Sequence, residues 1–371
     1  MMNELPVHDD MLFSMLYGGM AVLAVIACCY LLFRRGNAFA PNITSPVRLR
    51  RCAAAYFAAV ALSHVLWILI GDLGLIDDSF VSYAVATGLD VVMLDFTMMA
   101  MLLAMLQDRR RPFWPLAVAM VPFVVVVAVC IARRSDALDQ LLHAYDLLLD
   151  AIFIIYMVYA LRQYRRWLHD NYADLEHKEM WLSFVVVAVF LLSFVFYEKD
   201  NDSLAFMCFA EVIDFVLICL ILWRVETLQQ LDAPSTQREG SVEAPAAPAA
   251  APSTIPSNIG QLLEQHCENT QLYLHHDLTL SQLSEAVGTN RYYLSQHFAQ
   301  QGLNYNAYIN GLRIQHFINL YHEAIATQRP FTAQQLANES GFRSYSTFSA
   351  AFKQRMGQTV TSWMHETAEK P

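Results

Sequence analysis

The chain has 371 residues, of which 56% are hydrophobic and 16% are charged, and its formal net charge is −10 at pH 7. Average soluble domains are about 45–50% apolar and about 25% charged. The apolar excess falls within residues 1–231, whereas residues 259–371 have an ordinary soluble composition. This uneven distribution excludes a single uniform globular enzyme, a disordered chain and a small disulfide scaffold.

Apolar stretches in the first part of the chain are long enough to cross a bilayer, which takes about 17–25 helical residues. There are seven of them, at 12–33, 52–71, 81–106, 113–132, 141–161, 180–197 and 204–223. The first follows an acidic start and lacks a small-residue cleavage site, so we expect a retained helix and not a removed signal peptide. The only lysines in this part, Lys178 and Lys199, lie at helix edges, which argues against a retinal photoreceptor.

The charges of the connecting loops predict the orientation of this bundle. Thirteen Lys and Arg residues lie after the first, third, fifth and seventh stretches, against three in the alternate loops. Since positively charged loops stay in the cytoplasm, we expect the N-terminus outside and the C-terminus inside. The pair Arg133 and Arg134 is the exception, because it falls on the outer side.

Acidic residues lie within the predicted spans, and no Lys or Arg lies deep enough to pair with them. They are Asp90, Asp95, Asp146, Asp150, Glu211 and Asp214, with His64 in the second span. Four of the acids lie at a similar depth, roughly 10–15 Å from the outer end, where they would line one outward-facing cavity. Because unpaired ionisable groups inside a bilayer are costly, they are candidates for sensing a cation, protons or a polar ligand. The alternative is that they form hydrogen bonds that hold the bundle together.

Residues 232–258 read DAPSTQREGSVEAPAAPAAAPSTIPSN, with five prolines and no apolar period. This composition predicts an extended, partly disordered linker. We therefore expect a seven-helix membrane domain at 1–231, a flexible linker at 232–258 and a separate cytoplasmic domain at 259–371.

The C-terminal part contains an internal repeat. TLSQLSEAVGTNRYYLSQHFAQQG (279–302) and TAQQLANESGFRSYSTFSAAFKQRMG (332–357) each combine a T-x-x-Q capping box, a short helix, a glycine turn and a second helix. This is a helix-turn-helix pattern that occurs twice. Residues 305–326 predict one connecting amphipathic helix of roughly 33 Å, close to the ~34 Å of one DNA turn. A rod of this length can set two recognition helices into successive major grooves.

Apolar spacing predicts which side chains of this domain are buried. In the repeats they are Leu283, Leu294, Phe298, Leu336, Phe342, Phe348 and Phe352. In the connecting helix they are Tyr308, Leu312, Ile314, Ile318, Tyr321 and Ile325. The whole chain is thus expected to be all-α, with about seven helices in the C-terminal domain.

Residues 260–367 resemble the C-terminal DNA-binding domain of the AraC/XylS transcription regulators. The resemblance rests on LTLSQLSEAVG, YYLSQHFAQQG, YINGLRI, QQLANESGF and YSTFSAAFKQRMGQTV, and it covers none of the membrane part. Members of this family usually carry a soluble sensor domain, so this chain looks like a membrane-anchored variant. The resemblance implies a bacterial protein of the cytoplasmic (inner) membrane whose partner is double-stranded DNA.

The resemblance also implies that the second helix of each repeat enters the major groove. Its outward residues would be Asn290, Arg291, Tyr292, Ser295, Gln296 and Gln300 in the first repeat, and Arg343, Tyr345, Ser346, Ser349, Lys353 and Arg355 in the second. Gln296 suits adenine and the serines suit either base type, whereas the arginines and Lys353 are better phosphate anchors. Arg313 matches a family arginine in the connecting helix and is either structural or phosphate-facing.

The domain departs from the family in charge. Gln296, Ala299 and Ala350 stand where family members often have Arg or Lys, and Val360 stands where they have proline. Residues 259–371 hold seven Lys and Arg against eight Asp and Glu. Few cations predict weak non-specific DNA affinity with a shallow salt dependence. Homodimerisation through the membrane bundle would compensate by placing two domains on one site.

These patterns favour a membrane-bound, sequence-specific transcription regulator whose bundle senses an unknown signal. The alternative is a membrane receptor or transporter whose helix-turn-helix domain binds protein, which the depleted basic charge supports. An enzyme is not expected, because no nucleophile–base pattern, phosphate loop or HExxH motif occurs. No metal or cofactor is expected either, because the seven cysteines and the histidines lack metal-ligand spacing.

Overall fold

A computed structural model describes residues 11–34, 37–38, 44–134, 139–175, 204–231 and 258–369. Within these ranges the secondary structure is helical, apart from one isolated two-residue bridge, and the predicted all-α fold is confirmed. The predicted span at 180–197 and nearly all of the predicted linker lie outside the described residues. The chain divides into two compact units, one formed by 1–164 with 180–236 and the other by 165–179 with 237–371.

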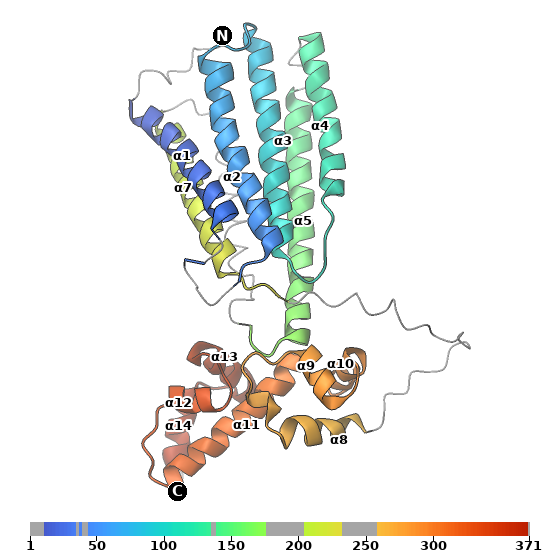
Figure 1. Ribbon diagram of the computed structural model, residues 1–371, viewed down its shortest axis with the longest axis vertical. Helices are drawn as coiled ribbons and strands as arrows, with labels where there is room; N and C mark the ends of the chain where they lie inside the picture. The colour runs from blue at the N-terminus through green and yellow to red at the C-terminus, as the bar shows by residue number, and fades with distance from the viewer. Residues whose placement is uncertain are drawn as a thin grey trace, which may run out of the picture. The chain divides into compact units, whose positions relative to one another are not determined.

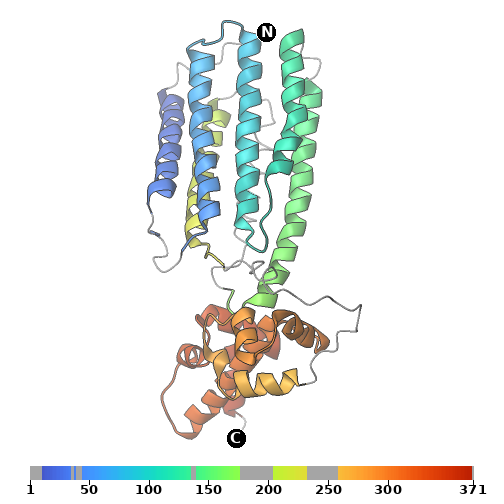
Figure 2. The same ribbon diagram turned by 45° about the vertical axis from the view of Figure 1, so that its right-hand side comes forward.

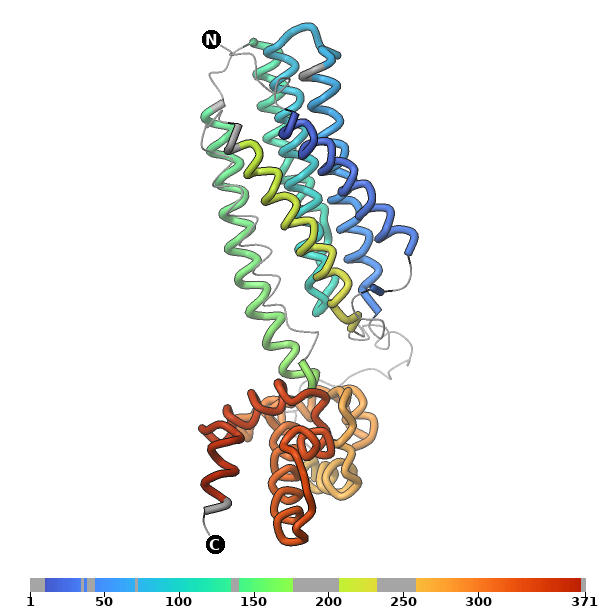
Figure 3. Tube along the Cα trace, turned by 90° about the vertical axis from the view of Figure 1, so that its left-hand side faces the viewer, coloured from blue at the N-terminus to red at the C-terminus, as the bar shows by residue number. Residues whose placement is uncertain are grey.

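The first unit is built from long apolar helices. They are α1 (Met11–Phe33), α2 (Val47–Trp67), α3 (Ser79–Met105), α4 (Trp114–Arg133), the greater part of α5 (Asp139–Asn171), and α7 (Leu204–Thr227). The helix α2 packs between α1 and α3, while α3 also packs on α4 and α7 lies along α1 and α2 (Figures 1, 2 and 3).

Five of the described helices are long and apolar enough to cross a membrane. They cover Met11–Phe33, Val47–Ile70, Ser79–Met105, Trp114–Arg133 and Gln140–Asn171. These five segments coincide with the first five predicted spans. The helix α7 coincides with the predicted seventh span but is not one of the five, and it carries Glu211, Asp214 and Arg224.

Asp78 organises one end of the bundle. Its carboxylate accepts hydrogen bonds from the backbone N–H of Phe80 (3.1 Å) and Val81 (3.3 Å), which caps the start of α3. The same side chain forms an ion pair with Arg134. One of the two arginines that depart from the predicted charge pattern is therefore paired with an acid.

The second unit contains the two repeats. Seven α-helices are described between residues 258 and 369, namely α8 (Ile259–Leu263), α9 (Leu280–Val287), α10 (Arg291–Gln300), α11 (Tyr305–Ala326), α12 (Ala333–Glu339), α13 (Tyr345–Met356) and α14 (Val360–Glu369). The pairs α9–α10 and α12–α13 form the two helix-turn-helix halves, and α11 joins them with the predicted bounds (Figure 1).

Both predicted capping boxes are present. The hydroxyl of Thr279 accepts from the backbone N–H of Gln282 (3.2 Å), and the side chain of Gln282 accepts from the backbone N–H of Thr279 (2.9 Å). Thr332 and Gln335 repeat the arrangement in the second half, with both distances at 3.1 Å. The first helix of each half therefore begins at the same kind of N-terminal cap, which gives hydrogen-bond partners to N–H groups that would otherwise lack them.

Each half has its own hydrophobic core, and α11 contributes to both. Its first turns supply Tyr305 and Ile309 to the core of the first half, and Ile314, Phe317 and Tyr321 belong to the core of the second half. All seven repeat residues predicted as core are buried. The prediction for Ile325 is wrong, because its side chain is 44% exposed. Ile325 shares a helix face with the buried Tyr321, four residues earlier, but it lies in the last turn of α11, which extends past the second core.

Candidate functional site

The second helix of each repeat, α10 and α13, begins at a side-chain cap. The glycine Gly288 closes α9 with φ = +71°, a conformation that glycine adopts without steric cost. Asn290 then caps α10, because its Oδ1 accepts from the backbone N–H of Tyr293 (3.1 Å). Ser344 caps α13 in the same way through Thr347 (3.3 Å). The side chain of Asn290, a predicted DNA contact, is therefore already used to cap α10.

The helix α10 buries one side and exposes the other. Leu294 and Phe298 are buried, whereas Tyr292 is 62% exposed and Ser295 is also exposed. Spacing of three and four residues puts Tyr292, Ser295 and Ala299 on one outward stripe. The predicted contact Gln300 is exposed at the end of the helix, and Arg291 is half-buried at its start.

Gln296 lies beside the exposed stripe of α10 and is half-buried. Its Oε1 atom is buried and has no hydrogen-bond partner. Because a buried amide oxygen without a partner is unfavourable, the side chain has a reason to turn outward when a donor is offered. The predicted pairing of Gln296 with adenine would supply such a donor, since the exocyclic N6 amine donates in the major groove.

The helix α13 presents a similar stripe. Ser346 and Lys353 are exposed, and Ser349 is half-buried between them. Tyr345 is different, because it packs against the second core with its ring centroid 5.8 Å from that of Phe348. The outward stripe of α13 is therefore made by the two serines and the lysine, with the tyrosine at its inner edge.

Two of the predicted phosphate anchors have partners inside the domain. Arg343 donates from Nη1 to Oδ1 of Asp277 at 3.3 Å, with both side chains largely exposed. The guanidinium of Arg355 lies over Gly311 of α11, where a Cβ atom would stand 2.7 Å from Nη1. Lys353 is thus the predicted cation that lies directly on the outward stripe of α13.

Arg313 has a structural role, which settles the alternative left open by the sequence. It is 1% exposed and donates from Nε to the carbonyl oxygen of Tyr273 (2.7 Å). Its Nη2 donates to the carbonyl oxygens of His275 (2.6 Å) and His276 (3.3 Å). Burial lowers the pKa of Arg313 to about 10, so the guanidinium stays charged at neutral pH. One buried cation therefore holds residues 273–278, which we call the strap.

The strap contacts the turn of the second repeat. Nδ1 of His276 is 3.1 Å from the carbonyl oxygen of Gly341. Gly341 has φ = +91°, and a Cβ atom on it would lie 2.8 Å from the Cα of Leu274. Tyr273 and Leu278 of the strap belong to the first core, whereas Leu274 and His276 between them contact the second turn. Arg313 therefore holds a segment that joins the two halves. The sequence predicts a glycine turn in the second repeat and a role for Arg313, but it does not predict the strap that joins them.

In the first unit the acids form neighbouring groups. Asp95 of α3 lies close to Asp146 and Asp150 of α5. All three side chains are buried, and one oxygen each of Asp95 and Asp150 has no hydrogen-bond partner. A proton or a bound donor group would relieve the repulsion among carboxylates that are buried this close together. This group is therefore a place where a proton or a donor group can be held.

The second group of acids surrounds His64. Its Nε2 lies 3.4 Å from Oε2 of Glu211, and its Nδ1 lies 2.8 Å from the carbonyl oxygen of Val60. Asp214 is an electrostatic neighbour of both His64 and Glu211, and Asp90 accepts from the indole N–H of Trp67. The sequence predicts no Lys or Arg partner for these acids, and in the structure Glu211 is paired with His64 instead.

Neither group lines the hollow between α3 and α4. That hollow is lined by apolar side chains, namely Val92, Phe96, Ala117, Met120, Val121, Val124 and Val125. Within the described ranges, no group of three or more His, Cys, Asp or Glu side chains is arranged to hold a metal ion.

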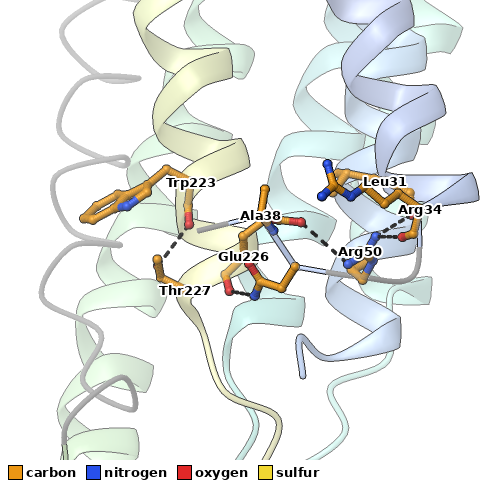
Figure 4. Close-up of polar contacts among 8 residues, drawn as sticks. Leu31, Arg34, Ala38, Arg50, Trp223, Glu226 and Thr227 are labelled. Atoms are coloured by element: carbon orange, nitrogen blue, oxygen red, sulfur yellow. Dashed lines mark hydrogen bonds and ion pairs between the residues drawn. The ribbon is translucent and has the colours of Figure 1, made fainter. Parts of the chain in front are cut away.

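The end of α7 is tied to other helices of the bundle (Figure 4). The fully buried carboxylate of Glu226 accepts from the backbone N–H of Ala38 (2.7 Å) and lies 3.8 Å from Nη1 of Arg50. Arg50 also donates to the carbonyl oxygens of Leu31 (3.2 Å) and Arg34. The backbone N–H of Leu231 donates to Gln107 at the end of α3 (2.8 Å). The chain therefore leaves the bundle from a fixed point.

Comparison with known proteins agrees with this geometry. Residues 283–366 match a family described as a helix-turn-helix domain. The C-terminal region is an AraC-type helix-turn-helix domain. The resemblance to AraC/XylS regulators predicted from the sequence is confirmed for this part of the chain.

The helix-turn-helix domain is similar to curated proteins of Staphylococcus aureus. Uncharacterized HTH-type transcriptional regulators of strains MRSA252, COL and MSSA476 are 34%, 33% and 33% identical to it over 98 residues. The alignment covers 26% of this chain and only 12% of the length of each relative. No solved structure matches the chain. The similarity therefore supports the C-terminal domain and does not extend to the membrane part.

Proposed function

We propose that the chain is a membrane-bound, sequence-specific transcription regulator. Residues 1–231 form the membrane sensor and anchor, residues 232–258 form the linker, and residues 259–371 bind DNA. The observation that carries the proposal is the pair of helix-turn-helix halves joined by the single helix Tyr305–Ala326. At 1.5 Å per residue this helix is roughly 33 Å long, which suits two contacts one DNA turn apart.

The outward stripes assign roles within the DNA complex. Tyr292 and Ser295 of α10, and Ser346 and Ser349 of α13, would face base edges in two successive major grooves. Hydroxyl groups can donate to or accept from either base type, so these contacts would discriminate weakly between bases. Lys353 would contact phosphate and set the register. With so few cations on these surfaces, we expect binding that weakens only slowly with salt.

The membrane part supports the anchoring role. Five described helices are long and apolar enough to cross a bilayer, and the excess of Lys and Arg in alternate loops supports a cytoplasmic helix-turn-helix domain. The signal would act at the buried acids, because hydrogen-bonded carboxyl groups respond to protons, cations or amines. A homodimer formed through the bundle would bring two such domains to one operator.

DNA capture in native cells tests the proposal. The full-length protein is crosslinked and the bound DNA is sequenced, beside a triple variant with Tyr292→Ala, Ser346→Ala and Lys353→Ala. The matched control carries Gln315→Ala, Asn319→Ala and Arg329→Ala, which are also exposed and also lose one positive charge. We expect discrete promoter peaks with the native protein and the control, and a loss of about tenfold or more in the variant.

Absence of peaks in all three proteins, with each confirmed in the membrane, would contradict DNA binding. It would favour the alternative in which the helix-turn-helix domain binds a cytoplasmic protein. The low number of Lys and Arg residues in 259–371 is the observation that supports this second candidate function.

Replacing the buried acids tests the sensing role. We expect Asp150→Asn and Glu211→Gln to abolish or invert the change in reporter output when the external medium is shifted between about pH 5 and pH 8 or between sodium and potassium salts. Thr97→Val on α3 is the control, because its hydroxyl bonds only within its own helix (2.6 Å to Met93). Unchanged responses in both acid variants, at equal protein abundance, would mean that the acids only hold the bundle together.

A further inference from the structure

A short segment far upstream in the sequence is part of the second unit. Residues 165–175 belong to the same compact unit as residues 258–369. Ala173 is fully buried within the core of the first helix-turn-helix half. Its neighbours Tyr172 and Asp174 are also buried. We call residues 172–174 the docking segment.

The helix-turn-helix domain provides hydrogen-bond partners for the backbone of the docking segment. Tyr172 pairs with Thr279 in an antiparallel bridge, and the N–H of Ala173 donates to the carbonyl oxygen of Leu278 (3.5 Å). Nδ2 of Asn306, in the first turn of α11, donates to the carbonyl oxygens of Tyr172 (3.1 Å) and Ala173 (2.7 Å). A buried backbone needs such partners, so these contacts are specific to an ordered docked state.

The docking segment also reaches the strap. Asp174 is an electrostatic partner of the buried Arg313, whose charge it stabilises against the effect of burial. Leu278, which accepts from Ala173, is the last residue of the strap that Arg313 holds, and Thr279 follows it. The segment therefore contacts the part of the domain that sets the two halves relative to one another.

The docking segment follows the fifth predicted span without a linker. The helix α5 runs to Asn171, whose side chain donates to the carbonyl oxygen of Trp167 (2.8 Å). The ring of Trp167 lies edge-on to that of Tyr172, with centroids 5.6 Å apart. By contrast, the connection after α7 contains the Pro- and Ala-rich residues 232–258, which transmit a displacement poorly.

We propose that the docking segment is a second, direct connection between the membrane helices and the DNA-binding domain. A displacement of α5 is passed through residues 172–174 to the first helix-turn-helix half and the strap, and so changes the availability of the domain for DNA. The effect on transcription rests on the proposed function, whereas the docking itself does not. The surface that receives the segment is formed by Leu278, Thr279 and Asn306.

Hydrogen exchange of the full-length protein in lipid nanodiscs tests the docking without DNA. We expect the amides of 172–175 to be protected in the native protein and to exchange about tenfold faster in Asn306→Ala, because two hydrogen bonds are lost. Asn319→Ala, the same change at an exposed position of the same helix, is the matched control and should leave the rate unchanged. Ala173→Glu, which places a charge in the first core, should release the segment entirely while amides of 336–352 stay protected.

Free exchange of residues 172–175 in the native protein, or no acceleration in Asn306→Ala, would overturn the docking. A reporter driven by a promoter from the DNA-capture experiment tests the consequence. Asn306→Ala and Ala173→Glu should change its output at constant protein abundance, and Asn319→Ala should not. If exchange accelerates but output stays constant at a bound promoter, the docking has no regulatory effect and the proposed connection is wrong. If no promoter is bound, the proposed function fails while the docking measurement stands.

Discussion

Replacing Arg313 with methionine is expected to destabilise the helix-turn-helix domain by about 3–5 kcal/mol. Methionine keeps most of the apolar stem but donates no hydrogen bond. The carbonyl oxygens of Tyr273, His275 and His276 then lose their buried donor, and the strap keeps only its core packing and the contact of His276 with Gly341. Arg313→Lys should recover only part of the loss, because one ammonium group cannot reproduce the planar fork of a guanidinium.

Hydrogen exchange of the strap amides in the full-length protein measures this effect as a free energy of local opening. The amides of residues 273–278 should lose protection first, followed by those of the second turn at Gly341. DNA capture should show the promoter peaks reduced in parallel. Equal protection of the strap in the native and Arg313→Met proteins would show that the core packing, and not the arginine, holds the two halves.

Gly341→Ala is expected to cost far more stability than the same change at the equivalent position of the first repeat. Both glycines have positive φ, so alanine pays about 1 kcal/mol of backbone strain at either position. At Gly341 the new Cβ would also stand 2.8 Å from the Cα and 2.9 Å from the carbonyl oxygen of Leu274. Backbone cannot rotate away as a side chain can, so we expect a total of about 3 kcal/mol.

Gly288→Ala is the matched control, because nothing lies within 4 Å of a Cβ atom there. Its cost should stay near the backbone strain alone. Exchange protection of α12 and α13 in one variant, and of α9 and α10 in the other, reports the two losses separately. Similar losses in the two variants would mean that the close approach between Leu274 and Gly341 relaxes without penalty.

Local signals explain why the helix-turn-helix halves could be predicted. A capping box needs only four consecutive residues, and Thr279 and Thr332 both form the predicted one. The connecting helix 305–326 was predicted with its observed bounds, since apolar spacing and an asparagine cap define it. The buried residues of the repeats followed from the same spacing. At Ile325, spacing failed because the last turn of the helix extends past the core that buries its other residues.

Contacts between distant residues could not be predicted in the same way. Arg313 lies 37 to 40 residues from the carbonyl oxygens that it holds, and Asn306 lies 133 residues from Ala173. No periodicity relates such positions. The same holds for His64 and Glu211, which are 147 residues apart. The sequence identified the acids inside the apolar spans, but their division into groups depends on how α3, α5 and α7 pack.

The turns of the two repeats differ in how closely the surrounding structure packs on them, and this difference affects how the domain can evolve. The turn at Gly288 borders open space, so insertions and substitutions there disturb little beyond their own helix pair. The turn at Gly341 lies directly against the backbone of Leu274, so a larger side chain there would displace the strap. If the domain binds DNA as proposed, the first half can change toward new operator sequences while the second keeps the geometry constant. Anyone retargeting this protein by directed evolution should diversify α10 and its turn first.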